Sequence, residues 1–181
     1  MKFGVFIERD GVLNEAHVEH SQQVIPLAPG QLRINPAAAG LVRRLKAAGF
    51  IVIATTNQPG LSRGYQSRRA LDQMHARLKQ ELAIDDILLC PHDETDRCPC
   101  RKPQPGLLTE ARYKWQLDLD RSFVISDKWQ DAQAALAVGA TSLLIQSPWL
   151  GNAHHDLVLK DFRSAVDKLL QLHGAPMAVA G

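Results

Sequence analysis

The sequence predicts an α/β fold: a Rossmann-like three-layer sandwich with a mostly parallel central sheet and no large cap domain. Five short apolar runs have the length of buried strands, and amphipathic segments of helical period lie between them. Strands that alternate with helices favour right-handed crossovers and a parallel sheet covered on both faces. The chain has 181 residues, 45% of them hydrophobic, which suffices for one core but not for two full domains. One domain over residues 1–173 is therefore expected.

Each element has its own local signal. The expected strands are the apolar runs at residues 3–7, 50–54, 87–89, 123–125 and 142–145. Pro36 suits the first turn of a helix, and Gly49 ends the apolar pattern that follows it. Further helices are expected at residues 67–82, 105–115, 129–138 and 161–172. The tail, 174–181, has no periodicity and is expected to fray.

The composition disfavours several classes of partner. Lys and Arg (21) nearly balance Asp and Glu (19), with no long run of one sign, which argues against a nucleic-acid surface built on bulk charge. No apolar stretch approaches the roughly 20 residues that span a bilayer, and no signal-peptide pattern opens the chain. We therefore expect a cytoplasmic protein without a nucleic-acid or membrane partner. Nothing in the sequence favours an oligomer, so a monomer is expected.

Four polar segments lie after expected strands, either directly or further along the loop that follows the strand. They are 8–14, 55–65, 100–103 and 126–131. Each one alone is typical of an acidic turn, a helix cap or a surface loop. In parallel sheets, however, binding sites lie at the carboxyl ends of strands, so four such segments in succession predict one shared site.

These four segments resemble the motifs of haloacid-dehalogenase (HAD) superfamily phosphatases, in particular the D-glycero-D-manno-heptose 1,7-bisphosphate phosphatase and histidinol-phosphatase group. The resemblance covers roughly residues 3–145. In that family the first loop carries an Asp-x-Asp pair, the second a Thr, the third a Lys and the fourth an Asp-rich motif. By position, these residues correspond to Glu8, Asp10, Thr56, Lys102, Asp127 and Asp131.

The resemblance implies a chemistry for each carboxylate. The first, Glu8 here, attacks phosphorus and forms an acyl-phosphate intermediate. Asp10 protonates the leaving oxygen and then activates water. Glu8, Asp10 and Asp127 are expected to hold Mg²⁺, with Asp131 in support, because hard oxygen ligands suit this cation.

The substrate is expected to be a small phosphorylated metabolite. Lys102 and Thr56 would supply positive charge and hydrogen bonds to its phosphoryl group. For Arg63 and Lys128, solvated surface charge is the alternative interpretation. The expected substrate-binding residues are Thr56, Asn57, Gln58, Arg63, Arg101, Lys102 and Lys128.

Glu8 departs from the family pattern, which has Asp at the nucleophilic position. The extra methylene moves the carboxylate by about 1 Å, and such a misplacement can cost on the order of a hundredfold in rate. Magnesium binding should tolerate the change better, since the ligand oxygen is equivalent. Three interpretations stay open: a slow nucleophile, a phosphosugar-binding homologue with impaired catalysis, or a residue altered from the natural one. We expect a phosphatase whose catalytic competence the substitution leaves open.

A second metal site is predicted at residues 90–100. Cys90, His92, Cys98 and Cys100 include every cysteine of the chain. Three thiolates and one imidazole form a closed tetrahedral set, which is the structural type of zinc site. The alternative is a group of free cysteines beside a chance histidine. The family group that the chain resembles carries the same zinc loop, and zinc binding would order the segment before Arg101 and Lys102.

The choice of substrate depends on finer features. Segment 61–65 resembles the heptose-bisphosphate branch more than the histidinol-phosphate branch, so a phosphosugar is the first expectation and histidinol phosphate the alternative. A DNA 3′-phosphatase would need a basic stripe and aromatic platforms, which the sequence lacks. Only one short flap and one helix fit between Asp10 and Thr56, which predicts an open site.

Overall fold

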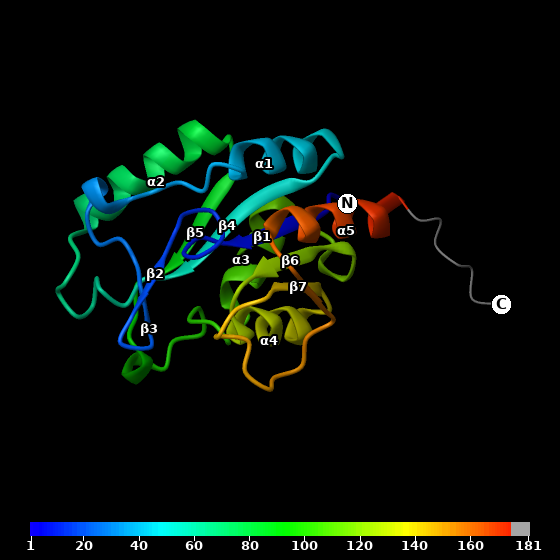
Figure 1. Cartoon of the computed structure of the whole chain (residues 1–181). Helices are drawn as coiled ribbons and strands as arrows, with labels where there is room; N and C mark the ends of the chain where they lie inside the picture. The colour runs from blue at the N-terminus through cyan, green and yellow to red at the C-terminus, as the bar shows by residue number, and fades with distance from the viewer. Residues whose placement is uncertain (175–181) are drawn as a thin grey trace.

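The computed structural model describes residues 1–174, so the expected frayed tail lies, from residue 175 on, outside the described residues. Its centre is a six-stranded sheet of order β5-β4-β1-β6-β7-β8, in which every neighbouring pair is parallel (Figure 1). The strands are β1 (Gly4–Glu8), β4 (Ile51–Asn57), β5 (Asp86–Cys90), β6 (Phe123–Ser126), β7 (Thr141–Ile145) and β8 (Leu157–Leu159). The predicted α/β fold with a parallel sheet is confirmed.

Helices cover both faces of the sheet, as Figure 1 shows, and create two separate cores. One face packs against α1 (Ala38–Ala47), α2 (Arg68–Leu82) and α5 (Phe162–Gly174). The other packs against α3 (Gly106–Trp115) and α4 (Trp129–Val138). None of the helices over residues 1–174 is long and apolar enough to cross a membrane.

The period of two along a strand explains the continuous apolar runs. In β1, Val5 and Ile7 belong to the core beneath α1, α2 and α5, whereas Phe6 belongs to the opposite core. All three side chains are fully buried. A strand covered on both faces therefore needs apolar residues at consecutive positions, which is the pattern of the parallel sheets found in α/β proteins.

Local signals account for helix ends. The hydroxyl of Ser67 caps α2 by accepting a hydrogen bond from the Ala70 N–H at 3.1 Å. Gly139 follows α4 with φ of +78°, a left-handed conformation that glycine adopts without steric cost. The first predicted helix begins at Ala38, two residues beyond Pro36.

Two features were not predicted as strands because their strands are too short to show a period. Three strands have only three residues each: β8 and the two strands of a hairpin, β2 (His17–Glu19) and β3 (Gln22–Val24). The hairpin is the short flap expected between Asp10 and Thr56. Three 3₁₀ helices complete the described chain: η1 (Pro29–Gln31), η2 (Glu94–Asp96) and η3 (Leu119–Arg121).

Candidate active site

Three segments that are distant in sequence come into contact at the carboxyl ends of the central strands. Glu8 is the last residue of β1, and Lys102 lies in the loop after η2. The Lys102 ammonium donates to the carboxylate of Glu8 and, at 2.7 Å, to Oδ1 of Asp131 in α4. All three side chains are almost completely buried. Residues separated by up to 123 positions therefore form one buried ionic chain.

Both oxygens of Glu8 are engaged within the protein. Oε1 accepts the Asp10 backbone N–H at 3.1 Å, and Oε2 accepts the Lys102 ammonium. Burial works to raise the pKa of this carboxyl, but the positive charges of Lys102 and Lys128 outweigh burial and hold the pKa below its usual value. Glu8 is therefore an ionised carboxylate.

Asp10 is surrounded by hydrogen-bond donors. Its Oδ1 accepts from Arg9 and from the amide of Asn14, the latter at 3.0 Å. Its Oδ2 accepts from the Thr56 hydroxyl at 3.3 Å and from the Gln58 amide at 2.8 Å. Burial alone would raise the pKa of Asp10, but the charge and hydrogen bonds of Arg9 lower it. The carboxylate is thus held ionised and oriented.

Arg9 and His75 are site residues that sequence reasoning missed. The guanidinium of Arg9 is fully buried, and its Nη1 lies 3.1 Å from Nε2 of His75 on α2. Burial and the neighbouring positive charge lower the pKa of His75 to about 4, so its imidazole is neutral and accepts the hydrogen bond. A signal existed: position 75 follows Leu71 by four residues, on the buried face of α2.

Lys128 lies among the expected magnesium ligands. Its ammonium donates to the backbone carbonyl of Asp10 at 2.5 Å and to Oδ1 of Asp127 at 2.6 Å. The other oxygen of Asp127 accepts the amide of Gln23, in the hairpin strand β3, at 3.1 Å. Burial raises the pKa of Asp127 despite the neighbouring ammonium. The alternative expectation for Lys128, a solvated surface charge, is wrong because the ammonium is paired inside the site.

Asp131 accepts a hydrogen bond from Lys102, as Glu8 does, but one of its two carboxylate oxygens has no partner among the described residues. Burial, and then the charge of Glu8, raise its pKa to about 6 against the pull of Lys102. Its Oδ2 has no hydrogen-bond partner among the described residues. Asp131 contacts Lys102 and so orients the lysine.

Asp127 and Gln23 approach the backbone at position 11 so closely that only glycine fits there. The φ of Gly11 is +99°, and a Cβ built there would lie 2.3 Å from Oδ2 of Asp127 and 2.8 Å from the amide of Gln23. A side chain at this position would therefore push the Asp127 carboxylate out of place.

Several residues expected to face the substrate contact the protein itself. Asn57 accepts the backbone N–H of Lys102 and donates to its carbonyl, both at 3.1 Å, so it fixes the lysine loop. Gln58 is fully buried and donates to Asp10 and Thr56. The expectation that Gln58 faces substrate is corrected accordingly: its amide is used inside the site.

The two arginines are tied to the loop at residues 90–100. Arg63 donates from Nε and Nη2 to the carboxylate of Asp93, both at 2.6 Å. Arg101 donates to the His92 carbonyl at 3.3 Å and to Glu94 at 3.1 Å. The structure therefore joins Arg63 to this loop rather than to the site, and a substrate contact for Arg63 finds no support in its geometry.

A cavity of about 700 Å³ opens beside Lys102. Asn57, Arg97, Arg101, Lys102 and Trp129 are among its lining residues. This volume suits a small-molecule ligand. The charged lining is mixed: Arg97, Arg101 and Lys102 are basic, and Asp93 and Glu94 are acidic. The basic groups suit the anionic part of a ligand.

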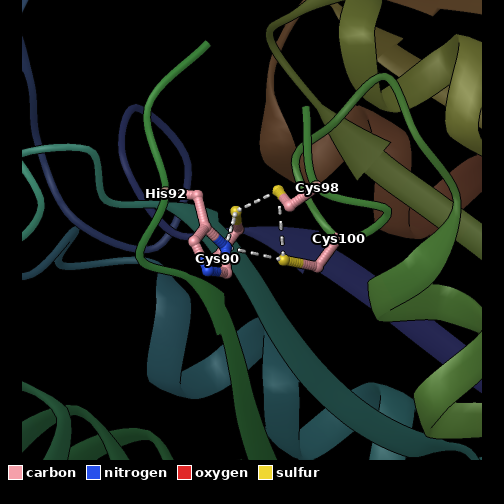
Figure 2. Close-up of side chains that lie close together, drawn as sticks. All are labelled: Cys90, His92, Cys98 and Cys100. Carbon is pink, nitrogen blue, oxygen red and sulfur yellow. Dashed lines mark hydrogen bonds between the residues drawn. The ribbon is translucent and has the colours of Figure 1, made fainter. Parts of the chain in front are cut away.

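The four ligands predicted for zinc form one cluster. Their ligand atoms all lie within 4.8 Å of one another (Figure 2). The Cys98 and Cys100 sulfurs are 3.5 Å apart, and Nδ1 of His92 lies 3.3 Å from the sulfur of Cys100. These separations match the edges of a small tetrahedron, so the cluster has the size and ligand types of a structural zinc site.

Buried carboxylates after β1 and β6, with a lysine brought between them, define a phosphoryl-transfer hydrolase of the HAD class on this fold. A family model described as HAD-hydrolase-like matches residues 99–165. The D-glycero-beta-D-manno-heptose-1,7-bisphosphate 7-phosphatase of Pseudomonas putida is 33% identical over 151 residues, covering 79% of this chain and 82% of that protein. The Helicobacter pylori protein of the same name is 31% identical over 173 residues, covering 90% and 95%. The chain belongs to this heptose-bisphosphate phosphatase family, which confirms the predicted resemblance.

Solved structures agree with this assignment. The D,D-heptose 1,7-bisphosphate phosphatase from B. bronchiseptica, complexed with magnesium and phosphate, has a TM-score of 0.82 and 29% identity, covering 95% of this chain and 99% of that one. The corresponding phosphatase from Burkholderia thailandensis has a TM-score of 0.68 at 23% identity, which supports the fold alone.

Proposed function

We propose that this chain is a magnesium-dependent phosphatase that hydrolyses a phosphomonoester of a phosphorylated sugar, with D-glycero-β-D-manno-heptose 1,7-bisphosphate as the first candidate. The observation that carries the proposal is the contact of Glu8, Lys102 and Asp131 at one sheet edge, beside a cavity whose lining includes basic groups. The names of the relatives support the substrate class. They disfavour histidinol phosphate.

The residues present fit a magnesium ion. The Asp10 carbonyl and the Asp127 carboxylate already converge on one positive group, the Lys128 ammonium, and the charge of Glu8 acts on the same ammonium. A carbonyl and two carboxylates are hard oxygen ligands of the kind that Mg²⁺ prefers. When bound there, magnesium supplies positive charge that neutralises phosphoryl oxygens.

Each site residue has a proposed step. A Glu8 oxygen attacks phosphorus, the bond from phosphorus to the sugar oxygen breaks, and that oxygen takes a proton from Asp10. Asp10 then removes a proton from water, whose oxygen attacks phosphorus and releases Glu8 and inorganic phosphate. Asp10 is ionised in the free protein, so the negative charge of a bound phosphate must raise its pKa for the first step. Lys102 must release Glu8 and bind a phosphoryl oxygen.

The cluster of three cysteines and one histidine is proposed to hold one structural zinc ion. Cys100 directly precedes Arg101 and Lys102 in sequence. A metal that fixes Cys100 would therefore also fix the backbone that carries the Lys102 ammonium to Glu8.

The remaining proposals concern context. We propose a monomer that acts in the cytoplasm on a small phosphorylated metabolite, without a nucleic-acid partner. The mass in solution, measured by light scattering, tests the first of these. A mass of twice 20.0 kDa would contradict it.

The test of the activity is release of inorganic phosphate from heptose 1,7-bisphosphate with magnesium present. The wild type should turn over, and Asp10→Asn should lose activity while still binding the compound. Histidinol phosphate serves as the competing substrate and should react more slowly. If the wild type is inert but binds heptose bisphosphate, the chain is a phosphosugar-binding homologue and the proposed chemistry is wrong.

A further inference from the structure

The ammonium of Lys128 occupies the position where the proposed magnesium ligands converge. It lies 2.5 Å from the carbonyl oxygen of Asp10 and 2.6 Å from Oδ1 of Asp127. Magnesium binds its ligands at about 2.0–2.1 Å in near-ideal octahedral geometry. One pair of oxygens cannot hold the ammonium and the metal at the same time, so one of the two cations must leave.

The surrounding charges explain why the ammonium is held. Four buried carboxylates of the site face three cations, of which two are buried and the third, Lys128, is half-buried. The carboxylates are Glu8, Asp10, Asp127 and Asp131, and the other cations are Arg9 and Lys102. Arg9 forms an ion pair with Asp10, and Lys102 forms ion pairs with Glu8 and Asp131. Without Lys128, Asp127 would keep only the neutral amide of Gln23 as a side-chain partner among the described residues.

An exit for the ammonium is present. Lys128 also lines a second cavity of about 630 Å³, together with Gln23, Trp129 and Trp149. The Lys128 backbone is extended, directly before α4, so its side chain can change rotamer without disturbing the helix. A negatively charged phosphoryl group bound beside Asp10 would offer the displaced ammonium a new partner.

We infer that Lys128 is a built-in cation that competes with magnesium for the Asp10 carbonyl and the Asp127 carboxylate, and that phosphate binding helps to expel it. This inference rests on the magnesium site of the proposed function. Magnesium and phosphate both favour the state in which Lys128 has left, so each strengthens the binding of the other through this side chain. The protein is also stabilised in the absence of magnesium, because the ammonium neutralises the site.

The experiment is titration calorimetry of magnesium into the zinc-loaded protein, with and without inorganic phosphate. The variants are Lys128→Met, Lys128→Gln and, as a control for loss of one positive charge, Lys160→Met at an exposed position. Without phosphate, Lys128→Met should bind magnesium about tenfold more tightly than the wild type or more, because charge-assisted hydrogen bonds no longer oppose the metal. Lys160→Met should match the wild type.

Phosphate gives the second comparison. It should tighten magnesium binding more in the wild type than in Lys128→Met, since only the wild type has an ammonium to expel. If Lys128→Met fails to fold, Lys128→Gln carries both comparisons, because Gln keeps a donor for Asp127 without the charge. Magnesium affinity that is equal or weaker in these variants, or absent from all proteins, overturns the inference. No turnover is required, so a failed phosphatase assay with a tighter Lys128→Met isotherm leaves this inference standing.

Discussion

The guanidinium of Arg9 donates two hydrogen bonds to one carboxylate oxygen of Asp10, from Nε at 3.1 Å and from Nη2 at 2.7 Å. Both side chains are almost completely buried, so neither charge is solvated. Replacing Arg9 with Met would leave the carboxylate without its charge partner. Removal of one partner from a buried ion pair costs about 3–5 kcal/mol. We expect a loss of that size in the free energy of unfolding of Arg9→Met, measured by urea denaturation.

The matched control is Arg43→Met, at an exposed position of α1. Its effect should stay within about 0.5 kcal/mol, as for most surface substitutions. Equal stability of the two variants would show that the pair of Arg9 and Asp10 does not support the fold.

His75 predicts a pH dependence of stability. In the folded protein its imidazole stays neutral down to a pKa of about 4, whereas in the unfolded chain it takes up a proton near the ordinary histidine pKa of 6.5. The unfolded state therefore binds more protons between these values, and folding stability falls as pH drops from about 6.5 towards 4. The loss attributable to His75 is about 3 kcal/mol at most.

Urea unfolding at pH 7 and pH 4.5 measures this effect. His75→Gln should lose less stability over the interval than the wild type, because Gln still accepts from Arg9 but does not titrate. His20→Gln, at an exposed turn, should behave as the wild type. An unchanged pH profile in His75→Gln would assign the acid sensitivity to other groups.

Shortening Glu8, the proposed nucleophile, should raise activity. In Glu8→Asp the carboxylate retreats by one methylene to the place that the family's Asp occupies. A correction of about 1 Å in the attacking atom is worth on the order of a hundredfold in rate. Phosphate release from heptose 1,7-bisphosphate should therefore be faster in Glu8→Asp, with Glu8→Gln inactive. A slower Glu8→Asp enzyme would mean that the site is built around the longer side chain.

Zinc removal should disturb the active site from a distance. Metal analysis of the protein should give about one zinc per chain, and Cys98→Ser should lower both the zinc content and the melting temperature. Catalysis should fall as well, because the loop that carries Lys102 follows Cys100 directly. A zinc-free wild type, purified under reducing conditions with full activity, would contradict the proposed metal site.

Local patterns in the sequence determined much of the fold. Apolar runs such as Val5 to Ile7 encode a strand buried on both faces, and Gly139 encodes a helix end through its left-handed conformation. The hairpin β2–β3 and strand β8 escaped, because three-residue strands with exposed or half-buried side chains leave no period to detect. The cluster of the four expected zinc ligands could also be predicted from the sequence, since all four residues lie within one short segment.

Only the tertiary structure decided which side chains meet. Motif positions indicated Asp10, but not that His75, 66 residues from Arg9, completes its support. Nor could spacing place the Lys128 ammonium between two expected metal ligands, or turn Asn57 towards the backbone of Lys102. The physical reason is range: strand and helix patterns arise from neighbours a few residues apart. Hydrogen bonds and ion pairs between loops depend instead on where the folded sheet brings those loops together.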